Sequence, residues 1–177
     1  HSAVLTGTAP YQEIWFTKEI KYGLQLRQGY GREFYRFGLE LGGGLFLIKD
    51  INPGVEGSSP MYITPGSGGI YLSANDGVNG QELHYSQGDA FTTNMVKDIY
   101  PGLNNSSNPM WLIKLGTEMI FSADDGENGR ELWITDNTEE GTRMIKDINP
   151  GNNSSNPTGP MKAVSYTHLT LPTSPHV

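Results

Sequence analysis

The sequence of 177 residues contains no cysteine, which excludes disulfide frameworks, thiolate metal sites and cysteine nucleophiles. Charged residues are scarce, at 18%, and no run of about 18 apolar residues predicts a membrane-spanning helix. Twelve Lys and Arg against 19 Asp and Glu give a net charge of -7 without a basic block, so we expect no nucleic-acid partner. Glycine (23) and proline (11) are plentiful, which is typical of a turn-rich β protein.

The chain repeats itself with a period of 48 or 49 residues. Glu33, Glu82 and Glu131 each open a copy of the same string, and the copies from Glu82 and Glu131 align without a gap. The other landmarks are Lys-Asp-Ile steps at Lys49, Lys97 and Lys146 and Ser-Ser pairs at Ser58, Ser106 and Ser154. Because independent landmarks keep one register, we expect one structural unit per repeat.

Each unit divides into four short strands separated by turn residues. Asp-Gly and Asn-Gly pairs supply the positive φ of a hairpin loop between the second and third strands. Asn-Pro-Gly suits a type II turn after the fourth strand. The predicted strands are Met61–Thr64, Ile70–Ala74, Glu82–Ser86 and Asn94–Ile99 in one unit, and Met110–Leu115, Met119–Ala123, Glu131–Thr135 and Arg143–Ile148 in the next.

Four strands per repeat predict an all-β fold of tandem antiparallel units that resemble β-propeller blades, with a β-solenoid or a stack of small sandwiches as the alternative. In the first unit Ile14–Thr17 looks like a second strand, and Lys18–Gln28 after it is longer than its counterparts and lacks the Asp-Gly turn. Propellers close with about 4–8 blades, so we expect an incomplete array. The expected divisions are a divergent unit at 1–48, repeats at 49–97 and 98–146, and the start of a further unit at 147–163.

The two ends of the sequence differ from the rest. Residues 164–177 resemble translated sequencing-adaptor DNA, and from Ser165 to Val177 there is no Asp, Glu, Lys, Arg or Gly. We expect a non-native or disordered tail there. The sequence begins at His1 without a signal-peptide pattern, so the native termini stay open.

The strings ELWITDNT from Glu131 and KDINPG from Lys146 carry a family resemblance. Over about Gly31 to Pro157 the chain resembles the bacterial repeat family named for its ELWxxDGT signature. His84 stands where the signature has Trp, and Asn137 where it has Gly. The resemblance implies a repetitive β fold and an extracellular or cell-surface location, with no assigned catalytic residue.

Aspartates cluster in the hairpin loop of each complete unit. Asp124 and Asp125 lie in one loop and Asp76 in the other. Clustered oxygen ligands suit calcium, which is the one cofactor that the sequence suggests. The alternative is a turn whose Asp and Asn side chains bond their own backbone.

Two further sets of carboxylates recur once per unit. The glutamates that open the repeats could serve glycosidase chemistry or form a structural hydrogen bond. The aspartates of the Lys-Asp-Ile steps could form a ring on one rim, or each could accept N–H groups of the following turn beside a solvated lysine. The aspartates are Asp50, Asp98 and Asp147.

Three aromatic side chains are candidate ligand-binding residues. Trp111 and Trp133 could stack on sugars or fill the space between sheets. His84 takes the place of Trp133 in the preceding unit, which a tolerated substitution also explains.

We therefore expect a non-catalytic, exported repeat scaffold for adhesion or for carbohydrate or protein binding at the cell surface, with further repeats as partners. One alternative is a glycan hydrolase, in which non-repeating carboxylates such as Glu40, Asp89 and Glu118 would converge on a pocket. The other is a structural spacer without a ligand.

Overall fold

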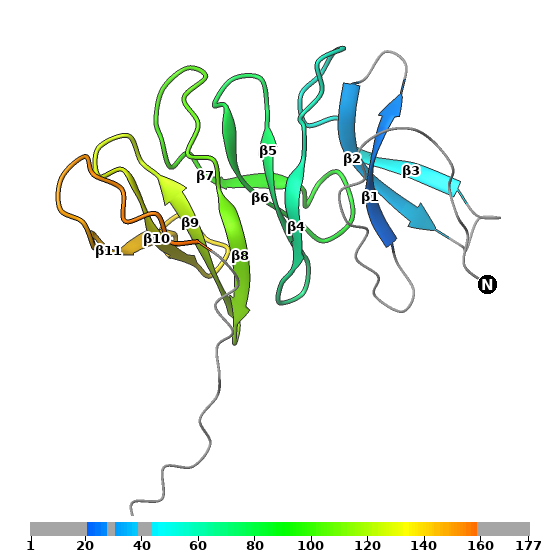
Figure 1. The fold of residues 1–177 in the computed structure, drawn as a ribbon. Coiled ribbons are helices and arrows are strands. Elements are labelled where there is room, and N and C mark those ends of the chain that lie inside the picture. Colours follow the sequence, from blue (N-terminus) through cyan, green and yellow to red (C-terminus); the bar gives the residue numbers. More distant parts are fainter. Residues whose placement is uncertain (1–20, 28–30, 39–43, 159–177) are drawn as a thin grey trace, which may run out of the picture.

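The computed structural model describes residues 21–27, 31–38 and 44–158 of the chain. Within these residues the strands form three antiparallel sheets that stand side by side in an open row (Figure 1). The all-β prediction is confirmed, and the second and third sheets each have four strands. No helix in this part of the chain is long and apolar enough to cross a membrane.

Each sheet is a meander, because strands that follow one another in sequence are paired in space. The first sheet contains β1 (Lys21–Arg27), β2 (Gly31–Gly38) and β3 (Gly44–Lys49). The second contains β4 (Met61–Pro65), β5 (Ile70–Asn75), β6 (Gln81–Ser86) and β7 (Asn94–Lys97). The third contains β8 (Met110–Leu115), β9 (Glu118–Asp124), β10 (Arg130–Thr135) and β11 (Arg143–Lys146).

The fourth strand of both four-stranded sheets ends earlier than the sequence predicts. β7 stops at Lys97 and β11 at Lys146, whereas the predicted strands continue to Ile99 and Ile148. The backbone N–H groups of Ile99 and Ile148 donate to glutamate carboxylates at 3.2 Å. An N–H group that is bonded to a side chain does not extend the ladder, so the strand ends there.

The first sheet corrects the interpretation of the first unit. β1 lies inside Lys18–Gln28 and pairs along its whole length with β2, so it holds the place that β5 and β9 hold in their sheets. Tyr22, Leu24 and Leu26 alternate with other residues, which is the period-two pattern of a strand. The predicted strand at Ile14–Thr17 lies outside the described residues.

The hydrophobic core lies between the sheets. Successive strand residues point to opposite faces. Leu72 and Ala74 therefore pack with Phe34 toward the first sheet, while Tyr71 packs with Phe121 toward the third. Each large apolar side chain buried in this way contributes about 1.5–3 kcal/mol. The second sheet is thus covered on both faces.

Two lysine side chains connect neighbouring sheets, which corrects the interpretation of Lys49 and Lys97 as solvated neighbours. Lys49 Nζ donates to the carbonyl oxygen of Thr93 in the second unit at 2.5 Å. Lys97 Nζ donates to the carbonyl oxygen of Thr142 in the third unit at 2.9 Å. Both threonines directly precede the fourth strand of their sheet. Lys49 and Lys97 therefore help to hold the sheet that follows each of them.

Candidate functional site

A buried glutamate joins each unit to the linker that follows it. Glu82 lies on β6 and is 0% exposed. Its Oε2 accepts the N–H of Ile99 at 3.2 Å and the hydroxyl of Ser107 at 2.5 Å, and its Oε1 accepts the N–H of Ser107 at 2.7 Å. One carboxylate thus ties β6 to the end of the fourth strand and to the linker that leads to β8.

The same three bonds recur around Glu33 and Glu131, and we call this arrangement the glutamate clamp. The prediction of a structural hydrogen bond for these glutamates is confirmed. Because each carboxylate accepts three protein donors, it is committed to the fold. The donors are Ile51 and Ser58 for Glu33, and Ile148 and Ser155 for Glu131.

The serine partners shift the alignment of the first unit by one residue. Ser107 and Ser155 are each the second serine of their pair, whereas Ser58 is the first of its own pair. All three nevertheless bond a clamp glutamate through both N–H and hydroxyl. The clamp, and not the serine pair, therefore defines the structural register.

The hairpin loops between the second and third strands hold their own backbone with aspartate. Asp76 Oδ1 accepts the N–H groups of Val78 and Asn79 at 2.9 and 2.7 Å, and its Oδ2 accepts the Asn79 amide at 2.7 Å. Asp125 accepts the equivalent three bonds in the third sheet. Burial acts to raise the pKa of both carboxyls, but these hydrogen bonds outweigh it and lower the pKa. The interpretation as a self-bonded turn is confirmed.

Calcium binding by Asp76, Asp124 and Asp125 stays a prediction. Asp124 Oδ1 accepts the Gly126 N–H at 2.8 Å, so all three carboxylates serve their own turn. Among the described residues, no three His, Asp or Glu side chains are grouped to hold a metal ion. A calcium ion would compete with the donors of the turn.

The aspartates of the Lys-Asp-Ile steps lie beside the turn that follows them. Asp147 Oδ2 accepts the N–H of Gly151 at 3.2 Å, as the turn interpretation predicts. Burial, followed by the charge of Asp76, raises the pKa of Asp98. One oxygen of Asp50, of Asp98 and of Asp147 is buried without a hydrogen-bond partner. Because this recurs in every unit, it is a property of the repeat.

His84 and Trp133 occupy equivalent buried positions on β6 and β10. His84 is 3% exposed, its Nδ1 lies 3.1 Å from the carbonyl oxygen of Glu82, and burial lowers its pKa. Trp133 is 6% exposed and belongs to the core between the second and third sheets. Neither ring offers an open face for stacking, so the space-filling interpretation describes the position of Trp133.

Trp111 differs because it is held exposed beside a second aromatic ring. Trp111 on β8 is 40% exposed, and Tyr62, its equivalent on β4, is 38% exposed. The ring centroids lie 6.1 Å apart and the ring planes are tilted by 54°. We call Tyr62 and Trp111 the aromatic pair.

Both members of the aromatic pair have an unusual backbone. Their φ angles are 52° and 57°, at points where the first strand shifts register against the second. A left-handed backbone costs about 1–2 kcal/mol at a non-glycine residue. Bulges of this kind change the direction in which a side chain points from the strand. Recurrence of the bulge in two units indicates that exposure of the ring is built into the repeat.

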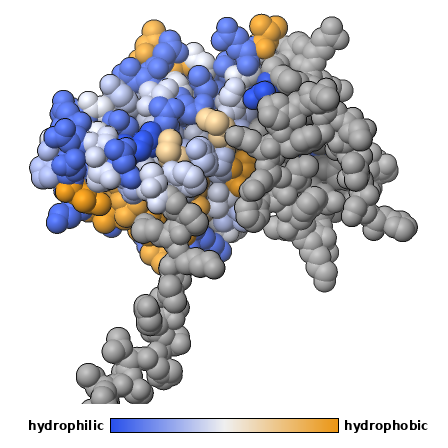
Figure 2. All heavy atoms as spheres, viewed as in Figure 1, coloured by the Kyte–Doolittle hydropathy of each residue, from blue (hydrophilic) through white to orange (hydrophobic). Residues whose placement is uncertain are grey.

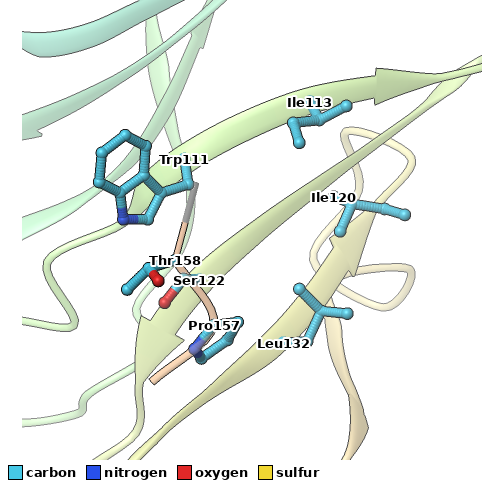
Figure 3. Close-up of a pocket in the computed structure, with 7 residues that line it drawn as sticks. All are labelled: Trp111, Ile113, Ile120, Ser122, Leu132, Pro157 and Thr158. Carbon is cyan, nitrogen blue, oxygen red and sulfur yellow. The ribbon is translucent and has the colours of Figure 1, made fainter. Parts of the chain in front are cut away.

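A shallow hollow of about 80 Å³ lies beside Trp111 (Figure 3). Its side chains come from three neighbouring strands and from the last described residues, and none is a carboxylate. They are Trp111, Ile113, Ile120, Ser122, Leu132, Pro157 and Thr158.

Comparisons of the chain with protein-family models, with curated proteins and with solved structures found no match. Any functional assignment therefore depends on the residues of the chain itself.

Tyr62 is the site residue that sequence reasoning missed. It precedes Trp111 by one repeat, and each of the two follows a methionine at the start of the first strand. That shared pattern was the available signal. The exposure of the rings could not be predicted, because neither bulge contains the glycine or asparagine that usually marks a positive φ.

Replacing the central clamp residue, Glu82→Ala, should lower the free energy of unfolding by about 3 kcal/mol or more, because each buried donor left unpaired costs about 1–3 kcal/mol. Ser107→Ala should cost about 1 kcal/mol, since it removes one donor. Urea denaturation followed by circular dichroism measures both. Glu127→Ala, an exposed turn substitution, is the control. A Glu82→Ala effect as small as that of the control would contradict the clamp.

The clamp should also make stability depend on pH. Burial raises the pKa of Glu82 from 4.5 to about 7, although its hydrogen bonds oppose the shift. Between these values the folded state holds a proton that the unfolded state has lost, so the free energy of unfolding falls as pH rises. We expect the stability of the wild type relative to Glu82→Gln to be higher at pH 4.5 than at pH 7, the two ends of this range. A pH-independent difference would contradict the assignment.

Proposed function

We propose that the chain is a non-catalytic scaffold of tandem four-stranded units, arranged as blades of a β-propeller-like array, which binds carbohydrates or proteins at a cell surface. The observation that carries the proposal is the aromatic pair. Two rings are turned out of the sheets by equivalent strained bulges and lie side by side at the edge formed by β4 and β8.

The arrangement of the units supports a blade-like array. Each four-stranded unit is a meander, and neighbouring units pack face to face through apolar side chains. The first strands β4 and β8 approach each other, as the innermost strands of neighbouring blades do. The clamp recurs once per unit, and the interunit lysine bond recurs wherever a further sheet follows, so both would serve any number of units.

The hydrogen bonds that the carboxylates accept within the fold support a non-catalytic role. Glycoside hydrolysis requires two free carboxyl groups about 5–10 Å apart. The clamp glutamates are bonded to the fold, and Asp89 accepts the N–H groups of Phe91 and Thr92 in its own loop. Glu118 lies at the start of β9 in the other sheet, and Glu40 lies outside the described residues. Neither Asp89 nor Glu118 lines the hollow.

The chemistry of the aromatic pair supports a ligand with an apolar face. Aromatic rings present a flat hydrophobic surface, and pyranose rings offer a face of C–H groups of similar size. The two tilted rings could contact one such sugar or an aromatic side chain of a protein. The extracellular location is proposed from the resemblance to the ELWxxDGT repeats, and the absence of cysteine is compatible with it.

Binding should depend on Trp111. We expect the full chain to bind at least one member of a broad glycan and surface-protein panel, and Trp111→Ala to weaken that binding about tenfold or more, by loss of ring contact worth about 1.4 kcal/mol. Immobilised panels identify the ligand, and titration by tryptophan fluorescence quantifies it.

The matched control is Phe91→Ala, because Phe91 is also an exposed aromatic residue, at 94%, but lies in the loop between β6 and β7. It should bind like the wild type. If Trp111→Ala binds the ligand as tightly as the wild type does, the aromatic pair is not the binding site. Absence of any ligand for the wild type would favour the spacer interpretation.

A further inference from the structure

The third sheet has an apolar face that no other sheet of the described residues covers, although Pro157 and Thr158 line part of it. Ile145 and Ile148 are 42% and 55% exposed. Ile113, Ile120 and Leu132 project to one side from β8, β9 and β10 (Figure 3). In Figure 2 hydrophobic residues gather over this sheet, beside the end of the described chain. We call this surface the outer face.

The equivalent face of the second sheet is buried. Tyr71, Leu83 and Ile99 are 2%, 0% and 3% exposed and belong to the core that the third sheet completes. One repeat later, the same positions are Ile120, Leu132 and Ile148. The same repeat position is therefore buried where a following unit packs on it and accessible on the outer face.

Lys146 shows the same contrast. Lys49 and Lys97 each donate to a threonine carbonyl of the following unit. Lys146 occupies the same place in its Lys-Asp-Ile step, but it is exposed and has no such acceptor in the part of the chain that the structure describes.

We propose that the outer face is a docking surface for a further four-stranded unit of this same repeat type. The occupant presents an apolar second strand, like the face of β9 that carries Met119 and Phe121, and a threonine carbonyl for Lys146. Its first strand places an aromatic ring beside Trp111, as β8 places Trp111 beside Tyr62. The contact continues an interface that the chain already forms between its own sheets, and it does not depend on ligand binding.

The pKa of the clamp glutamate in the last unit differs from those in the units before it. Burial raises the pKa of Glu33 and of Glu82, and a further sheet follows each of these glutamates in the chain. Burial acts in the same direction at Glu131, but there the hydrogen bonds from Ser155 and Ile148 outweigh it and the pKa is lowered. If a further unit follows the third sheet, we expect more burial around Glu131 and a pKa raised as those of Glu33 and Glu82 are.

The test extends the chain by one unit. In the extended chain, residues 1–157 are followed by a second copy of residues 110–158. Pro157 then precedes the added unit as Pro109 precedes the third sheet. We expect one cooperative urea transition at a higher midpoint than that of the parent chain. The Ile148 amide should exchange as slowly as the Ile99 amide, and the pKa of Glu131, followed by carboxyl NMR, should rise.

Two substitutions separate docking from simple lengthening. Leu132→Asp and Lys146→Met should each change the midpoint little in the parent chain and remove part or all of the gain in the extended chain. Phe91→Ala lies outside the interface, so it should change the urea midpoint by the same amount in the parent chain and in the extended chain. If Leu132→Asp disturbs folding of the parent chain, Lys146→Met still tests the docking on its own.

Either of two results would overturn the proposal. One is an extended chain with two separate transitions, the first at the parent midpoint, and an Ile148 amide that exchanges as in the parent. The other is a parent chain that dimerises in a manner abolished by Leu132→Asp, because the occupant would then be the outer face of a second molecule.

Discussion

A buried carboxylate that accepts two backbone N–H groups and one hydroxyl is the interaction on which every unit depends. These N–H groups belong to the end of a strand and to a linker, where no sheet partner can reach them, and a buried N–H group without an acceptor is costly. Glu33, Glu82 and Glu131 provide the acceptors from β2, β6 and β10. The clamp therefore ends the fourth strand and fixes the path of the chain toward the next unit.

Fixing the linker has consequences at both edges of the sheets. At one edge β4 and β8 contact each other, and their bulges place the ring centroids of Tyr62 and Trp111 6.1 Å apart. At the ends of β3 and β7, Lys49 and Lys97 lie within hydrogen-bond distance of the following sheet. A local arrangement of hydrogen bonds thus produces a periodic surface, in which any binding site would also recur with the repeat.

The sequence predicts the second and third sheets almost strand by strand, because the landmark spacing and the Asp-Gly and Asn-Gly loops agree. Prediction from the sequence fails where a structural feature depends on a hydrogen bond to a residue far away in the sequence. The early end of β7 follows from the bond between Ile99 and Glu82, and the role of Lys97 follows from a carbonyl in another sheet. The exposure of Trp111 follows from a bulge without a turn signature, and β1 was missed because its unit lacks the Asp-Gly loop that marks the others.

Amide hydrogen exchange of the wild type and of Glu82→Ala, resolved by residue, tests the role of the clamp most directly. The account predicts that the amides of Ile99 and Ser107 lose their protection in the variant, because both donate to Glu82. The equivalent amides of Ile51 and Ser58, bonded to Glu33, should keep a protection set only by global unfolding. Unchanged protection at Ile99 and Ser107, or an equal loss at all four amides, would contradict the claim that each carboxylate fixes its own linker.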